Sequence, residues 1–228
     1  MKKLFAFTLA ETLVVIGIIG VVSALTLPNL NASTGDKENI AKVKKAYRDL
    51  DQALGMAKVK YGSYNTWFND VSGTAYTTRF AQRMTEFMKV TKTCGLNANQ
   101  GCFSKSNVIF SNGTKGSTFD AQTTYYKFIL SDGMSAAFYN NHIFIDIDGP
   151  NKGPNKYGYD IFLFIVENQS IVPRRADTFA NYLSGSTAVN NGGHFASGWV
   201  IDYDNMDYKK MLAGKCKTTP TETNPRCN

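Results

Sequence analysis

Oxygen-bearing side chains gather between residues 146 and 160, where they could bind a cation. Ca²⁺ takes six to eight oxygen ligands from carboxylates, amides and carbonyls. The spacing is not that of an EF-hand, because Pro150 stands at the fifth loop position and Tyr157 where the bidentate Glu belongs. Asp, Asn, Gly and Pro also form tight turns without any ion, so a calcium site and a plain turn both stay open. The candidate ligands are Asp146, Asp148, Asn151, Asn155 and Asp160.

Four cysteines could form disulfides, bind a metal or remain thiols. Zinc is disfavoured because the chain has no C-x-x-C motif and its two histidines stand far from the cysteines in the sequence. Four cysteines allow three pairings. We favour Cys94 with Cys102 and Cys216 with Cys227, because each pair closes a short local loop.

No arrangement typical of an enzyme is found in the sequence. There is no nucleophile elbow, phosphate-binding glycine loop or metal-binding helix. His194 follows two glycines and is interpreted as part of a loop, and Arg174 and Arg175 as a solvated turn. The net charge of +7 is modest for 228 residues and forms no basic stripe, so nucleic acid is not indicated as a partner. We expect no enzymatic activity.

Glu11 is the one charged residue between Phe7 and Leu27. A helix over these residues would be about 32 Å long, enough to cross a bilayer, with Lys2 and Lys3 on the cytoplasmic side. A plain membrane anchor and a secretory signal peptide cut after Ala24 both fit this segment. Neither explains Glu11, because a carboxylate in a membrane costs about 2.5–3.5 kcal/mol and therefore indicates a function.

The stretch from Phe7 to Ile16, FTLAETLVVI, resembles the prepilin-type N-terminal motif of type IV pilins and type II secretion pseudopilins. In that family a short basic leader is cut before an aromatic residue. Glu is then fifth in the mature chain and Pro often twenty-second. Here Phe7, Glu11 and Pro28 occupy these positions, whereas Ala6 replaces the usual Gly before the cut.

The resemblance implies a structural subunit of a type IV pilus or a type II secretion pseudopilus. A prepilin peptidase would cut after Ala6, and the methylated amine of Phe7 would lie near Glu11 of a neighbouring subunit. Other implied partners are further pilin or pseudopilin subunits, the assembly platform with its ATPase, and the bacterial cytoplasmic membrane, with the C-terminal part outside and the filament in the periplasm or at the cell surface. Some family members hold Ca²⁺ near the loop described above, and a C-terminal cysteine pair holds the last segment on the sheet. Small residues favour close helix packing at Gly17, Gly20 and Ala24.

Two alternatives to the filament subunit remain. A secreted soluble binding domain would begin at Leu25 after signal-peptide cleavage. A pilin-like DNA-uptake subunit is compatible with the modest positive charge and would bind DNA with a steep salt dependence.

The expected fold class is α+β: a long N-terminal helix, membrane-spanning in its first half and amphipathic in its second, packed on an antiparallel β-meander. Helical spacing predicts an amphipathic helix from Asp36 to Lys60 and a second helix carrying Phe80 and Met84. The expected divisions are a leader at 1–6, an assembly helix at 7–28, its amphipathic extension at 29–62 and a globular part at 63–228. Strands are expected at 125–130, 134–139, 143–147, 160–166 and 198–201.

Overall fold

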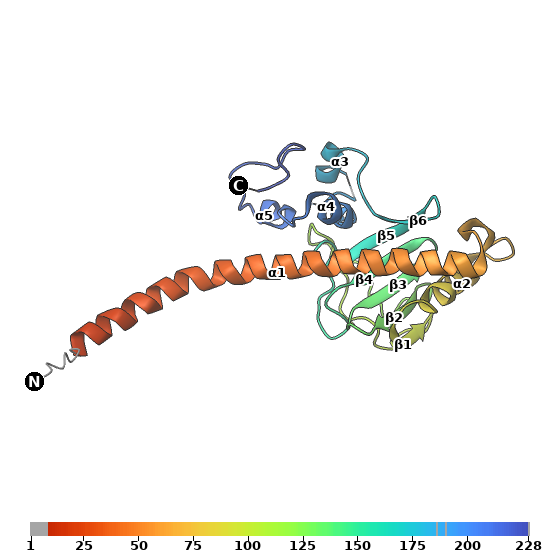
Figure 1. The fold of residues 1–228 in the computed structure, drawn as a ribbon, viewed down its shortest axis with the longest axis horizontal. Coiled ribbons are helices and arrows are strands. Elements are labelled where there is room, and N and C mark those ends of the chain that lie inside the picture. Colours follow the sequence, from red (N-terminus) through yellow and green to blue (C-terminus); the bar gives the residue numbers. More distant parts are fainter. Residues whose placement is uncertain (1–8, 186, 190, 228) are drawn as a thin grey trace, which may run out of the picture. The chain divides into compact units, whose positions relative to one another are not determined.

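The computed structural model describes residues 9–185, 187–189 and 191–227, and only the backbone of residues 23–34. The chain divides into two compact units, Met1–Glu38 and Asn39–Asn228. Helix α1 (Leu9–Tyr61) contributes to both units, and the second unit contains a six-stranded sheet with the shorter helices (Figure 1). The described part of the chain is therefore α+β.

The prediction that the first half of α1 spans a membrane is wrong. Across the residues that the structure describes, no helix is both long enough and apolar enough for a bilayer crossing.

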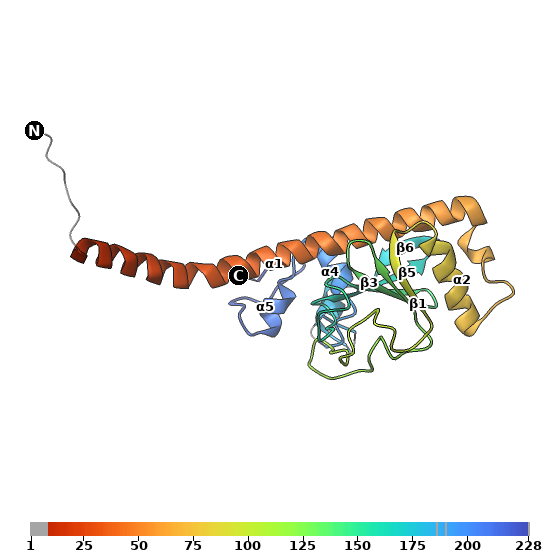
Figure 2. The ribbon, with the colours of Figure 1, turned by 90° about the horizontal axis from the view of Figure 1, so that it is seen from below.

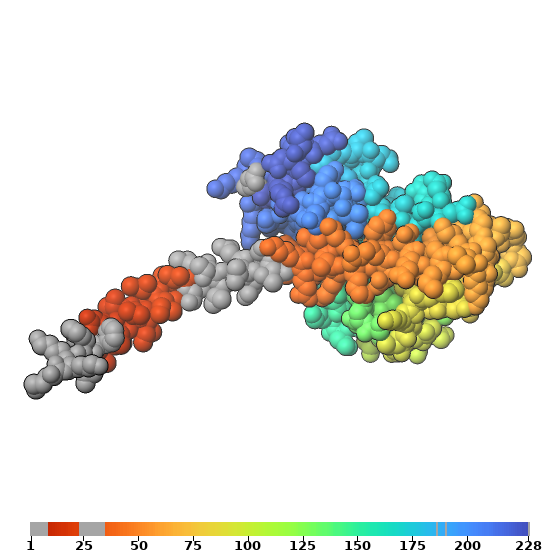
Figure 3. All heavy atoms as spheres, viewed as in Figure 1, coloured from red at the N-terminus to blue at the C-terminus, as the bar shows by residue number. Residues whose placement is uncertain are grey.

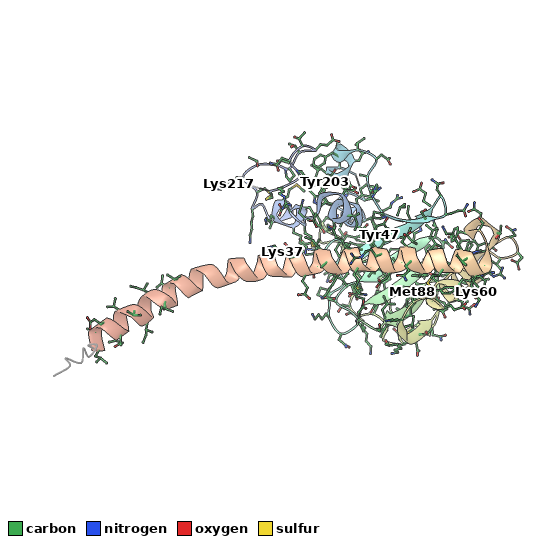
Figure 4. All side chains as sticks on the ribbon, in the orientation of Figure 1. Lys37, Tyr47, Lys60, Met88, Tyr203 and Lys217 are labelled. Atoms are coloured by element: carbon green, nitrogen blue, oxygen red, sulfur yellow. A yellow bond between two sulfur atoms is a disulfide. The ribbon has the colours of Figure 1, made fainter. Side chains whose placement is uncertain are left out.

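The part of α1 in the second unit, residues 39–61, covers one face of the sheet. It ends at Tyr61, one residue beyond the predicted end, and Gly62 follows with a φ of 79° that suits a helix C-terminus. Tyr47, labelled in Figure 4, stacks its ring on that of Phe164 in the sheet, with 5.9 Å between the ring centres. In the space-filling view this part of α1, in orange, lies between blue residues from the C-terminal part of the chain and yellow and green residues from its middle (Figure 3). Its buried side chains recur every three or four residues: Val43, Ala46, Leu50, Ala53, Leu54 and Ala57.

The sheet is a simple antiparallel meander in which each strand pairs with the next along the chain. Short turns make this order possible. Gly133 turns between β2 and β3 with a φ of 88°, and Asn168 and Gln169 turn between β5 and β6 with positive φ angles. The strands are β1 (Val90–Gly95), β2 (Tyr126–Leu130), β3 (Ser135–Tyr139), β4 (His142–Asp146), β5 (Ile161–Glu167) and β6 (Ser170–Pro173).

Both faces of the sheet are buried, by different parts of the chain. Phe162 and Phe164 face the main core, which α1, α2 (Gly73–Thr85) and α4 (Ala196–Tyr203) complete. Phe144 and Leu163 face a second core, to which Phe103 and Phe119 of the long β1–β2 connection belong. Figure 2 shows this connection on the side of the sheet opposite α1.

One predicted strand is wrong, and two strands were not predicted. Residues 198–201 belong to helix α4, whose five consecutive buried residues from Ala196 to Val200 hide the helical period. Strand β1 has mainly exposed polar residues and β6 is only four residues long, so neither gives a clear alternating pattern. The remaining short helices are η1 (Tyr64–Thr66), α3 (Phe179–Leu183) and α5 (Tyr208–Leu212).

Candidate functional site

The first turns of α1 carry the described part of the predicted assembly motif. Glu11 lies in the first turn and is exposed, and Thr12 donates a hydrogen bond to the carbonyl of Leu9 at 2.9 Å. A Cβ added at Gly17 or Gly20 would meet no atom within 4 Å. The helix surface at these glycines therefore has room for another helix to approach closely.

For four residues of the predicted motif, the structure describes either the backbone alone or nothing. Ala6 and Phe7, the predicted processing site, lie outside the described residues. Ala24 and Pro28 lie in helical backbone, and their side chains are outside the described part. Cleavage between Ala6 and Phe7 therefore stays a prediction, and so do the packing roles of Ala24 and Pro28.

Large apolar side chains are exposed along the same turns of α1. Leu9 is 80% exposed, Ile16 66% and Val22 54%, and the apolar residues between them are similarly open. Contiguous exposed apolar surface of this kind marks an interaction site in a folded protein. We call residues 9–22 the apolar segment.

Both favoured disulfides are present in the second unit. Cys94 is bonded to Cys102, and Cys216 to Cys227. Disulfides persist in oxidising compartments, so the two bonds suggest, weakly, that this unit resides in one.

A buried carboxylate organises the loop that the first disulfide closes. The side chain of Asp120 is fully buried and accepts hydrogen bonds from the amides of Gly101 and Cys102, each at 3.0 Å. Lys127 is also fully buried, donates to the carbonyls of Asp120 and Gln122, and has its pKa lowered by burial. These hydrogen bonds satisfy both charged groups and indicate a structural role for Asp120 and Lys127. No sequence motif predicted this role.

The predicted calcium ligands are only partly brought together. Asp146 ends β4 and is fully buried, and its Oδ1 accepts hydrogen bonds from the amides of Asp148 and Gly149 at 3.2 and 3.1 Å. Asp160 lies alongside, because the amide of Ile147 donates to its carbonyl at 2.9 Å. Asn151 is exposed. Asn155 is fully buried, and neither polar atom of its side chain has a hydrogen-bond partner among the described residues.

Asp146, Asp148 and Asp160 interact through their charges. Burial and the nearby carboxyls of Asp148 and Asp160 raise the pKa of Asp146 to about 9. Burial raises the pKa of Asp160 to about 7, with a contribution from the charge of Asp148. The raised pKa makes Asp146 neutral at pH 7 in the absence of a cation, and its Oδ2 and the Oδ1 of Asp148 are buried without a hydrogen-bond partner among the described residues.

The described residues contain no cluster of three or more His, Cys, Asp or Glu side chains placed to hold a metal ion. A calcium site here would also need amide and backbone oxygens, so the calcium hypothesis stays a prediction. The hydrogen bonds of Asp146 Oδ1 to the amides of Asp148 and Gly149 are those of an Asx turn, which forms without an ion.

Comparisons of the chain with models of protein families, with curated proteins and with solved structures gave no match.

Proposed function

We propose that this chain is a structural subunit of a filament of the type IV pilus or type II secretion pseudopilus class. The observation that carries the proposal is the exposed apolar segment, which overlaps the stretch from Phe7 to Ile16 that resembles the prepilin motif. Copies packing side by side would cover this surface and remove it from water. Burying apolar surface provides about 25 cal/mol per Å², so many copies together gain a large stabilisation.

Glu11 has a specific role in this packing. After a cut behind Ala6, the free amine would belong to Phe7, four residues before Glu11 in the sequence. A carboxylate next to an ammonium is far less costly to bury than either charge alone. Pairing between neighbouring subunits would therefore fix how far each helix slides along the next.

The remaining partners follow from this role. A prepilin peptidase processes the precursor, and an assembly platform with its ATPase adds the subunit to other pilin or pseudopilin subunits. The second unit, with its two disulfides, resides outside the cytoplasm, and the filament stands in the periplasm or at the cell surface.

The proposal is tested with Glu11→Gln, which keeps the size of the side chain and removes its charge. We expect the variant to be processed normally. Its amount in sheared filaments should fall at least about tenfold, which corresponds to a loss of about 1.4 kcal/mol in the free energy of assembly. Glu38→Gln, on the same helix, is the matched control and should assemble as wild type. Equal assembly of both variants would contradict the role of Glu11. Release of a soluble protein from the cells, with no filament, would favour the secreted binding domain instead.

A further inference from the structure

A surface cavity of about 410 Å³ opens on the face of the sheet opposite α1. Its walls are aromatic. Phe110 stacks on Tyr157 at 5.5 Å, and Phe144 lies against Tyr125 at 5.5 Å. The volume falls in the range of sites that hold small molecules.

Three nitrogen-bearing side chains converge on this cavity from separate segments: His142, Arg174 and His194. His142 begins β4 and lies on the same face as Phe144, two residues along the strand. Arg174 follows β6, and its amide donates to the carbonyl of Leu163 at 2.9 Å, which fixes its backbone beside β5.

A glycine turn places the third nitrogen-bearing side chain, His194. Gly193 has a φ of 78°, and a Cβ there would lie 2.1 Å from Ser111 Oγ and 2.9 Å from the carbonyl of Tyr157. Only glycine fits so close to this wall. The ring of His194 then meets Tyr157 edge-on at 4.5 Å. His142 and His194 are the chain's only histidines, and both line the same cavity.

The histidines of the cavity have unpartnered nitrogens within the described residues, and the guanidinium of Arg174 lies 5.7 Å from the centre of the Phe195 ring. The Nδ1 atoms of both histidines are buried without a hydrogen bond. No described carboxylate lies within ion-pairing distance of Arg174, although its neighbour Arg175 pairs with Asp202 at 2.9 Å. Burial and the nearby charge of Arg174 lower the pKa of both imidazoles, that of His194 to about 4. At pH 7 the cavity therefore contains one cation and two neutral rings with unused hydrogen-bonding nitrogens.

These groups define complementary chemistry in a ligand. A guanidinium binds a carboxylate with two parallel hydrogen bonds. A neutral imidazole nitrogen can be satisfied by a hydroxyl group, which both donates and accepts. Aromatic walls bury the apolar face of a ring. We propose that this cavity binds an acidic sugar residue, a carboxylated pyranose such as a hexuronate, either free or at the end of a glycan.

Binding is measured on the purified full chain at pH 7 by NMR of the imidazole ring signals. Because both histidines line the cavity, every imidazole signal reports on it. Sodium glucuronate should shift both sets of signals and saturate with a Kd of about 1 mM or tighter. Glucose lacks the carboxylate and benzoate lacks the hydroxyls, so each should bind at least tenfold more weakly. A glycan with a terminal glucuronate binding more tightly than the free acid would identify a glycan as the source of the sugar.

Arg174→Gln should weaken glucuronate binding at least tenfold, whereas Arg175→Gln should leave it unchanged. Arg175 is the matched control because it is adjacent in sequence, exposed and paired with Asp202. Thermal unfolding shows whether each variant is folded, and the comparison of the three probes on the wild-type chain does not depend on any variant. The proposal would be overturned if glucuronate gave no saturable shifts. It would also be overturned if glucose or benzoate bound as tightly as glucuronate, or if both substitutions weakened binding equally. The test is independent of filament assembly.

Discussion

Replacing Asp146 with Asn should stabilise the protein at neutral pH. Asn keeps the oxygen that accepts from the amides of Asp148 and Gly149, and its amide group can donate to the carboxylate of Asp148. The wild-type side chain must instead hold a proton, because its pKa is raised to about 9 in the folded state from 3.8 in the unfolded chain. The substitution therefore removes a proton requirement and retains the turn.

The sign and the size of the effect follow from linkage. A raised pKa in the folded state means that the unfolded chain binds fewer protons, so stability falls as the pH rises from about 4 to about 9. Each pH unit corresponds to about 1.4 kcal/mol, which gives about 4 kcal/mol between pH 4 and pH 7 as an upper value. Sharing of the proton with Asp148 reduces this loss of stability. We therefore expect Asp146→Asn to be more stable than wild type by about 2–4 kcal/mol at pH 7, and equally stable near pH 4.

Urea unfolding of both chains at pH 4, 5.5, 7 and 8 measures this difference. Asp177→Asn, at an exposed site, is the control and should follow the wild-type curve. A wild-type stability that is constant or rises with pH, or an Asp146→Asn chain that is less stable at pH 7, would refute the reasoning.

The same series tests the calcium hypothesis by metal removal. Calcium bound by an ionised Asp146 would stabilise the wild-type chain at pH 8 relative to the chain in a chelator, and Asp146→Asn would lose this gain. Identical unfolding curves with calcium and with chelator would contradict the calcium hypothesis and support a turn with a protonated Asp146.

Two further substitutions probe how tightly the second unit is built. Gly149→Ala should destabilise the protein by about 2 kcal/mol or more, because its Cβ would lie 2.2 Å from the carbonyl of Gly133. Gly113→Ala, with a similar positive φ and open space, should cost only about 1 kcal/mol, and equal losses in denaturant unfolding would contradict this difference. Replacing Cys94 and Cys102 together with Ser should lower the free energy of unfolding by about 2–4 kcal/mol, and an unchanged midpoint would show that the bond adds no stability.

Local sequence patterns predicted the helix that covers the sheet and the strands β2, β3, β4 and β5. The stripe from Val43 to Ala57 predicted the helix on the sheet, and the turn at Gly133 predicted the β2–β3 hairpin. The short apolar run around Trp199 was wrongly interpreted as a strand, because the five consecutive buried residues 196–200 show no helical period. Periodicity describes the exposure of an element and not its partners, which limits what it can predict.

The sequence was less informative about sites. It identified the cysteine pairs and the acidic loop, because those residues are close together along the chain. It missed the cavity of His142, Arg174 and His194, whose members come from three segments that the sheet and a glycine turn bring together. The sequence did offer one signal: the chain has only two histidines, so the position of each in the fold could have been considered.

The central claim, a processed filament subunit, is tested most directly by the intact mass and N-terminal sequence of the protein recovered from cells. The proposal predicts a chain that begins at Phe7 and carries one added methyl group. A chain that begins at Leu25 would contradict it, because the apolar segment and Glu11 would then be removed before any assembly. An uncut chain beginning at Met1 would contradict it as well, unless Ala6→Gly restores the cut.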